Sequence, residues 1–265
     1  MTASPSSGIN PRRYRNPPIV EAICEIRFDS DEVVDGQFRD AMRSRLAGEY
    51  PGQSRIRKSL NLDVALGDSG PPVVNQSETE ERLQLFDVTE TRLVAFSPQI
   101  LSIHMLAPYH LPGIEEPSGW AEFRPRIMNA LSCYWNVAKP HGAIRISLRY
   151  INRIALPART VNIQDFLTCA IASSPKLPEV VTNFISQFEF RYPDGAVLAL
   201  SQGSAPTPDN QPGFLLDLDI IQSFAQPSGL DLVEETLDEL RSRERIAFEA
   251  CITDQARELF DAAPS

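Results

Sequence analysis

Apolar and polar residues alternate over several stretches of the chain, and this pattern predicts β-strands. The clearest case is the stretch AIRISLRYINRI, residues 143–154. Successive side chains of a strand point to opposite faces of a sheet. Ile144 and nearly every second residue after it suit the core face, whereas Arg145, Arg149 and Arg153 fall together on the other face. The pattern therefore predicts a strand with one buried face and one arginine-rich face.

The other segments follow the same two periodicities. Alternation with a period of two predicts strands, and apolar residues three or four positions apart predict helices. Strands are expected over residues 19–28, 55–66, 183–192, 196–203 and 213–221, with two or three more between 82 and 106. Helices are expected over residues 36–50, 120–135, 162–171 and 230–260, the last one broken near residue 253. Pro125 is expected to kink its helix or to delay its start, and residues 67–81 are expected to form a polar loop.

The order of these elements predicts an α+β fold built from two similar halves. Residues 18–139 and 140–262 each run strand, helix, antiparallel strands, helix. We interpret them as pseudo-repeated halves, with curved antiparallel sheets covered by long helices, whose first strands pair in one continuous sheet. A single integrated domain is the alternative. Residues 1–17 are rich in serine, proline and arginine, so they are expected to form a flexible tail that contributes little to stability.

The arginine-rich face has two interpretations. Glu21 and Glu25 lie on the polar face of the first predicted strand. If the first strands of the two halves pair, these carboxylates could lie across from Arg145, Arg149 and Arg153 and form cross-strand ion pairs. Alternatively, the three arginines form a surface for an anion or an acidic partner, because guanidinium groups suit bidentate contacts with carboxylates and phosphates.

The overall charge narrows the choice of partner. The 265 residues contain 25 basic and 35 acidic side chains, which gives a formal net charge of -10. Such a balance disfavours direct binding to nucleic acid or to an anionic membrane, although it leaves room for a local basic patch. Another protein is therefore the expected partner.

The cysteines and the hydropathy pattern indicate the compartment. Cys24, Cys133, Cys169 and Cys251 lack metal-ligand spacing, and reduced thiols are their simplest state. A run of about 18 apolar residues is absent, so no membrane-spanning helix is expected. The first residues lack the apolar core of a signal peptide. We expect a cytoplasmic protein without a membrane contact.

Catalytic motifs are scarce in this sequence. It contains no nucleophile elbow of the GxSxG type and no glycine-rich phosphate loop. The one candidate constellation is Asp217 and Asp219, whose carboxylates share a strand face and could hold a divalent metal ion. With Gly203 and Ser204 they resemble the motif of polymerase β-type nucleotidyltransferases. The prolines after Ser204 prevent the helix that receives the triphosphate in those enzymes, so we favour two ordinary outward-facing aspartates.

Four segments resemble a sporadically distributed family of bacterial proteins of about this length. These segments are NPPIVEA followed by EIRF near the start, residues 104–127, RYINRI at 149–154, and FEACITDQARELF at 248–260. The family has no established biochemical activity. The scattered distribution of its members implies accessory roles such as defence or toxin control.

We therefore expect a non-enzymatic binding or regulatory module that acts on another macromolecule and needs no cofactor. Arg145, Arg149 and Arg153 are its candidate binding residues. One alternative is a metal-dependent nucleotidyl or phosphoryl transferase that uses Asp217 and Asp219. The other alternative is a small-ligand-binding protein with a cavity between sheet and helix.

Overall fold

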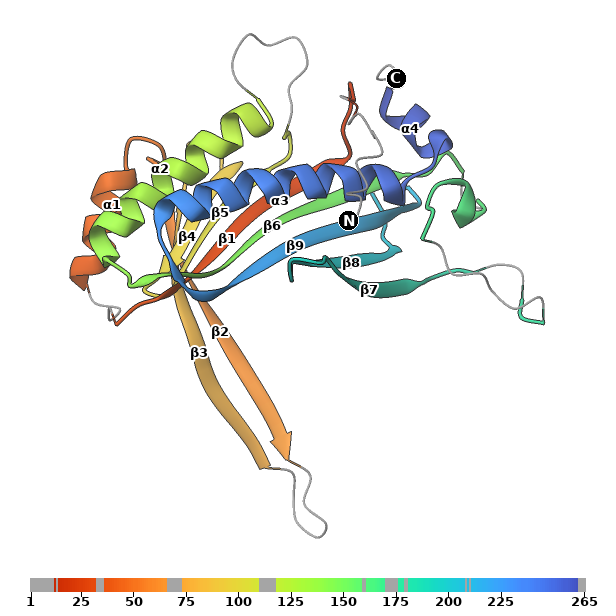
Figure 1. Cartoon of the computed structure of the whole chain (residues 1–265). Helices are drawn as coiled ribbons and strands as arrows, with labels where there is room; N and C mark the ends of the chain where they lie inside the picture. The colour runs from red at the N-terminus through yellow and green to blue at the C-terminus, as the bar shows by residue number, and fades with distance from the viewer. Residues whose placement is uncertain are drawn as a thin grey trace.

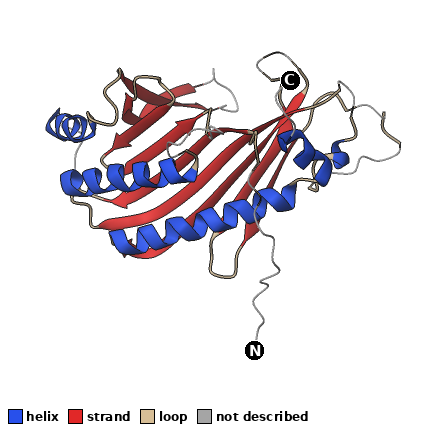
Figure 2. Cartoon of the chain, turned by 90° about the horizontal axis from the view of Figure 1, so that it is seen from above, coloured by secondary structure: helices blue, strands red, loops and turns tan. Residues whose placement is uncertain are grey.

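The computed structural model has one large antiparallel sheet with helices packed on one of its faces (Figure 1). The structure describes residues 12, 14–31, 36–65, 73–109, 118–158, 161–169, 176–178, 181–207, 209 and 211–261, with 58–65 and 73–81 described by their backbone alone. Seen from above, the long helices lie on the same side of the strands (Figure 2). The fold is α+β, as predicted. No described helix covers the other face, which we call the open face.

Fourteen elements follow one another along the described chain. In order they are β1 (Ile19–Asp29), α1 (Gly36–Leu46), β2 (Ser54–Ala65), β3 (Val73–Phe86), β4 (Arg92–Ser97), β5 (Ile100–Leu106), α2 (Trp120–Ala138), β6 (Gly142–Ala155), the 3₁₀ helix η1 (Ile163–Asp165), β7 (Ile185–Arg191), β8 (Val197–Ser204), β9 (Gly213–Ser228), α3 (Leu230–Cys251) and α4 (Asp254–Asp261).

The nine described strands form one sheet in the order β2-β3-β4-β5-β1-β6-β9-β8-β7. All neighbouring strands in this order are antiparallel. β1 and β6 are neighbours near the centre, with Cys24 opposite Leu148. The predicted pairing of these two strands is therefore present, and the sheet continues from residues 18–139 into residues 140–262.

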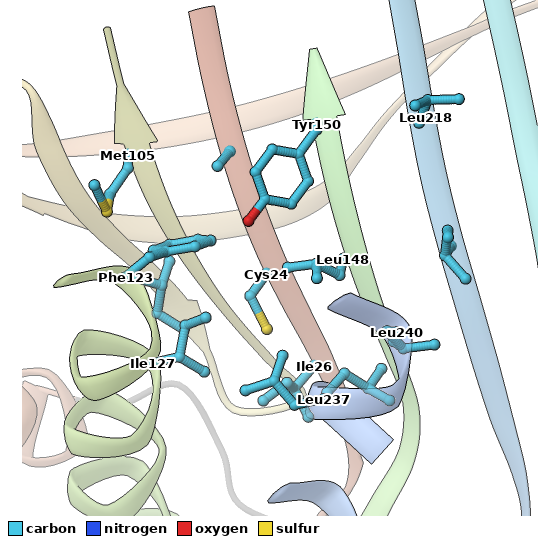
Figure 3. Close-up of a cluster of buried hydrophobic side chains, with 14 of the residues drawn as sticks. Cys24, Ile26, Met105, Phe123, Ile127, Leu148, Tyr150, Leu218, Leu237 and Leu240 are labelled. Carbon is cyan, nitrogen blue, oxygen red and sulfur yellow. The ribbon is translucent and has the colours of Figure 1, made fainter. Parts of the chain in front are cut away.

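One hydrophobic core lies between the sheet and the helices (Figure 3). It gathers buried side chains from β1, β5, β6, β9, α2 and α3, among them Cys24, Ile26, Met105, Phe123, Ile127, Leu148, Tyr150, Leu218, Leu237 and Leu240. Burying a large apolar side chain contributes about 1.5–3 kcal/mol. Because β1 and α2 share this core with β6, β9 and α3, neither half of the chain buries its apolar face alone.

The helices bury the stripes that their spacing predicts. α1 buries Phe38, Met42 and Leu46, and α2 and α3 each bury a stripe of the same period. Pro125 lies inside α2, yet the helix begins at Trp120, so the proline does not delay its start. The break predicted near residue 253 is present, because α3 and α4 are separate helices.

β2 and β3 form a two-stranded ribbon that extends away from the helices on the side of the open face (Figure 1). Only Leu83–Phe86 of β3 pair with β4, so β2 is the one described partner of the rest of β3. Residues 73–81 are thus strand, whereas the sequence pattern predicted a polar loop over 67–81. Polar composition does not exclude a strand that lies outside the layered core, so composition misled the prediction.

Two local predictions in the second half of the chain are wrong. Ile144 was expected on the core face, but its side chain is exposed. The pairing of β6 with β9 shifts between Ala143 and Arg145, and this bulge turns the extra residue outward. In the described part of the helix expected over 162–171, residues 162–169, only η1 is helical, and its N-cap Asn162 accepts a hydrogen bond from the backbone of Gln164.

Part of the predicted flexible tail packs against the rest of the protein. The predicted flexible tail covers residues 1–17, but Tyr14 is buried and packs against phenylalanines of α3 and α4. Its hydroxyl donates a hydrogen bond of 2.7 Å to Glu249. Residues 1–11 and 13 of the predicted tail lie outside the described residues. The packed part of the chain therefore includes Tyr14.

Candidate functional site

The arginine-rich face of β6 is part of the open face of the sheet. We call Arg145, Arg149 and Arg153 the arginine row. In the register of β1 and β6, Arg149 lies opposite Ile23, and Arg145 lies opposite Arg27. The row therefore has no acidic residue directly across from it on β1.

The carboxylates of β1 bind other partners instead. Glu25 accepts hydrogen bonds from Arg27 and from Arg82 of β3, each at 3.0 Å. Glu21 contacts Nδ1 of His104 on β5 at 2.8 Å. Burial alone would raise the pKa of Glu25, but the two guanidinium groups hold it below its ordinary value. The predicted ion pairs between these carboxylates and the arginine row are wrong, because Glu21 and Glu25 bind these other partners instead.

The carboxylate that binds the row comes from β9, on the other side of β6. Nε of Arg149 donates to Oδ1 of Asp217 at 2.8 Å, and a second nitrogen of the same guanidinium donates to Oδ2. This hydrogen bonding raises the pKa of Arg149. Arg145 and Arg153 form no ion pair with any described residue. Two of the three cations in the row are thus left without a direct carboxylate partner within the described part of the chain.

In two ion pairs of the open face the arginine is more exposed than its carboxylate. The side chain of Arg149 is 42% exposed, whereas its partner Asp217 is 18% exposed. Arg27 is likewise 42% exposed over Glu25, which is 22% exposed. A long guanidinium side chain reaches further from the sheet than a carboxylate does. Solvent or a partner therefore meets the cationic group first at these two pairs, although the chain as a whole carries a net charge of -10.

Asp217 and Asp219 lie on the open face, as the alternation predicts, but their surroundings differ. Asp217 holds Arg149, whereas Oδ1 of Asp219 is buried without a hydrogen-bond partner. Burial raises the pKa of Asp219, which nearby arginines only partly oppose. Among the described residues, no group of three or more histidine, cysteine or carboxylate side chains has the geometry of a metal site.

Ser204, which the nucleotidyltransferase alternative places near the two aspartates together with Gly203, lies on the opposite face of the sheet. Ser204 of β8 is paired with Phe214, whose side chain is buried in the core. Paired residues of neighbouring strands share a face, so Ser204 points to the helix side, away from Asp217 and Asp219. Its hydroxyl instead accepts a hydrogen bond from the backbone of Phe184. The structure does not bring Ser204 together with the aspartates.

The helix side of the sheet holds a cavity, where the small-ligand alternative placed one, but the sequence patterns did not indicate which residues line it. Its volume is about 760 Å³. Its walls are the second half of α3, the N-terminal segment that includes Tyr14, the start of α2, Tyr109 and Asn152 of β6. The cavity and the arginine row thus lie on opposite faces of the same strand.

Buried charged and polar groups meet at this cavity. Arg241 of α3 forms an ion pair with Glu244, and its guanidinium lies 4.8 Å from the ring centroid of Tyr150 and 5.5 Å from that of Trp120. The hydroxyl groups of Tyr150 and Tyr109 are 2.8 Å apart. Burial raises the pKa of Glu244 and raises that of Tyr109 to about 12.

Sequence reasoning missed this cluster because the charged run in α3 is typical of a solvated helix face. One signal was present, since Glu244 follows Val233, Leu237 and Leu240 at helical spacing and so falls on the buried stripe. A carboxylate on the apolar stripe of a helix requires a partner in the interior. That partner is Arg241.

Comparisons with known proteins leave the chain without an assigned relative. No family model matches it, and no curated protein matches it in sequence. Within the described residues, no helix combines the length and the apolar character needed to span a bilayer.

Proposed function

We propose that the chain is a non-enzymatic binding module whose open face receives an acidic segment of another protein. The observation that carries this proposal is the exposure of Arg27 and Arg149 above the carboxylates that neutralise them in part. Arg145 and Arg153 retain the capacity to bind carboxylates, since neither forms an ion pair with a described residue. A guanidinium group forms planar, bidentate contacts with carboxylates.

The shape of the molecule supports the same assignment. The ribbon of β2 and β3 leaves the sheet on the side of the open face (Figure 1). A segment seated on β1, β6 and β9 would therefore be flanked by this ribbon. The alternative of a metal-dependent transferase is less favoured, because Asp217 already binds Arg149 and Ser204 points to the other face. A role in defence or toxin control, implied by the family resemblance, is part of the proposal.

Peptide binding provides the test. Fluorescence anisotropy would compare a labelled glutamate-rich peptide, the same peptide with glutamine in place of glutamate, and single-stranded DNA of equal charge. The glutamate peptide should bind, and its affinity should fall as the salt concentration rises. The double variant Arg145→Gln and Arg153→Gln should weaken binding by about tenfold or more. These two positions are chosen because a change at Arg149 would leave Asp217 without its partner.

The matched control is Arg43→Gln with Arg45→Gln on α1, two exposed arginines on the helix side of the sheet. It removes the same type of charge from the same acidic chain and should leave peptide binding unchanged. An equal effect of both changes would show that general charge, and not the open face, determines binding. Binding of DNA through Arg145 and Arg153 with no binding of the glutamate peptide would replace the protein partner by nucleic acid.

We also propose that residues 18–139 and 140–262 are equivalent halves. The order of strands supports this proposal, because β1 pairs with β5, the last strand before α2, and β6 pairs with β9, the last strand before α3. β1 and β6 then join the halves in antiparallel orientation. On this proposal the open face is centred on the two equivalent first strands.

A further inference from the structure

The cavity on the helix side has features of a ligand site that are independent of the open face. It measures about 760 Å³, which is within the range of pockets for small molecules. Four of its described lining residues are aromatic, namely Tyr14, Tyr109, Trp120 and Phe248. A wall of this kind favours a ligand with a flat or apolar body.

Asn152 supplies an acceptor that has no donor. Its side chain is 1% exposed and lines the cavity. The amide nitrogen donates to the backbone oxygens of Leu216 at 3.1 Å and of Tyr150 at 3.4 Å. Both of these backbone oxygens can only accept hydrogen bonds, so the amide nitrogen, and not Oδ1, must face them. Oδ1 therefore points away from these two oxygens. Oδ1 is buried and has no hydrogen-bond partner, and a buried acceptor is stabilised when a donor reaches it.

Arg241 supplies donors that are not all used. A guanidinium group carries five N–H donors, and Glu244 is the one acceptor that Arg241 contacts among the described residues. The ring of Tyr150 lies beneath this guanidinium, and Tyr150 precedes Asn152 by two positions on β6. Residues two apart on a strand are about 7 Å apart. The donor group and the acceptor are therefore separated by a distance that one small molecule can bridge.

The charges of the lining residues limit what this molecule can be. Arg12, Arg241 and Arg245 are matched in number by acidic residues, namely Asp238, Glu244 and Glu249. Such a balanced wall disfavours a polyanion, because each added negative charge on the ligand meets carboxylates as well as arginines. A ligand with one anionic group satisfies Arg241 without this repulsion.

We propose that the cavity binds a small aromatic carboxylate that also carries a hydrogen-bond donor, with an aromatic amino acid as the simplest form. Its carboxylate accepts hydrogen bonds from Arg241. Its N–H group donates to Oδ1 of Asn152, and its ring packs among the aromatic side chains of the wall.

Isothermal titration calorimetry on the full chain would test both contacts with matched probes. L-tryptophan carries the ring, the carboxylate and the donor. Tryptamine lacks the carboxylate, and 1-naphthylacetate lacks the N–H donor. L-tryptophan should bind, and each of the other two should bind about tenfold or more weakly. Arg241→Lys should weaken L-tryptophan about tenfold and leave tryptamine unchanged, because lysine keeps the charge near Glu244 but loses the planar donor fork.

Two further variants locate the binding. Ser242→Trp places a large side chain on an exposed residue of the cavity wall and should abolish binding of L-tryptophan. Ser132→Trp makes the same substitution on an exposed residue of α2 that does not line the cavity, and should preserve it.

Several outcomes would overturn the proposal. One is a Kd no tighter than about 1 mM for L-tryptophan, L-tyrosine, L-phenylalanine and indole-3-acetate alike. Another is binding that survives in Ser242→Trp, which would place the site elsewhere. Tighter binding of AMP than of L-tryptophan at the cavity would contradict the argument from balanced charge and indicate a nucleotide site.

Discussion

Arg149 reaches diagonally across the open face, because its guanidinium binds Asp217 although Asp219 is the residue paired with it on β9. The two aspartates therefore differ in what their charge does for the protein. The charge of Asp217 is compensated by Arg149, whereas Oδ1 of Asp219 is buried and lacks a hydrogen-bond partner. Neutralising these two residues should have opposite effects.

A double-mutant cycle would measure the ion pair of Arg149. Changing Arg149→Met and Asp217→Asn, singly and together, should give a coupling free energy of about 0.5–1 kcal/mol in urea unfolding, as expected for a partly exposed pair. The control cycle combines Arg149→Met with Glu25→Gln and should give less than about 0.3 kcal/mol. Equal coupling in both cycles would contradict the structure and support the ion pair between Arg149 and Glu25 that the sequence predicted.

Asp219 should make the protein less stable as the pH rises. Burial raises the pKa of its carboxyl in the folded state, so folding favours the protonated form. Between the unfolded pKa, about 3.9, and the higher folded pKa, the native state binds more protons than the unfolded state, and stability falls with rising pH. Asp219→Asn should therefore raise the melting temperature at pH 7, and this gain over the native chain should shrink toward pH 4.

The matched control for this pH dependence is Asp217→Asn, two residues away on the same strand. It removes the partner of Arg149, so it should lower the melting temperature at pH 7. A loss of stability of similar size in both variants would mean that Asp219 is stabilised as an anion, contrary to its burial.

The sequence predicted which face each of these side chains occupies, but not which partner it binds. Alternation along one strand determines the face. The partner depends on strand order and register, and neither is encoded within a single strand. Arg149 thus binds Asp217 of β9, more than 60 positions later in the chain, and its own strand contains nothing that favours β9 over β1. The buried pair of Arg241 and Glu244 was missed for a related reason, since the helix that covers the cavity reads as charged along its sequence.

Among the elements, prediction succeeded for most of those that touch the layered core, although it failed for the helix expected over 162–171, where Phe166 and Leu167 are buried. The stripe of α1 and the buried face of β1 follow from helical and strand periodicity, because one face must exclude water. It failed for β3, whose first part lies outside the core, and for Ile144, where a bulge interrupts the alternation. β2, its partner in the ribbon, was predicted because its sequence alternates, whereas residues 73–81 of β3 are mostly polar and lack this alternation.

The ribbon should be dispensable for stability. Replacing residues 58–81 by Asn-Gly would join Arg57 to Arg82, which already face each other across the ribbon, through a two-residue hairpin turn. Because the removed part of β3 pairs only with β2 among the described strands, the free energy of unfolding should change by less than about 1 kcal/mol. Leu83→Ala, in the part of β3 that pairs with β4, should cost about 2–4 kcal/mol. A comparable loss from both changes would show that the ribbon supports the core.

At the scale of the whole molecule, the boundary between residues 139 and 140 separates two similar runs of elements along the chain, but one sheet and one core extend across it. β1 lies between β5 and β6, so separating residues 1–139 from residues 140–265 would expose the edge of β1 that pairs with β6. It would also remove α3 from Ile26 and its neighbours on β1, against which Leu237 lies in the core (Figure 3). The sequence indicated two halves because each has its own run of strands and helices. The shared core could not be seen, because it depends on how the halves meet.

A split of the chain at this boundary would therefore unfold both parts. Residues 1–139 and 140–265, expressed separately, should each lack a cooperative unfolding transition, since each leaves a central strand and an apolar face uncovered. Expressed together, they should associate and recover one transition, because the pairing of β1 with β6 and the burial on α3 favour the complex. A cut between β2 and β3 serves as the control, since the ribbon lies outside the core and its two strands should stay paired. Independent cooperative folding of residues 1–139 would show that the halves are separate domains and that their common core adds little.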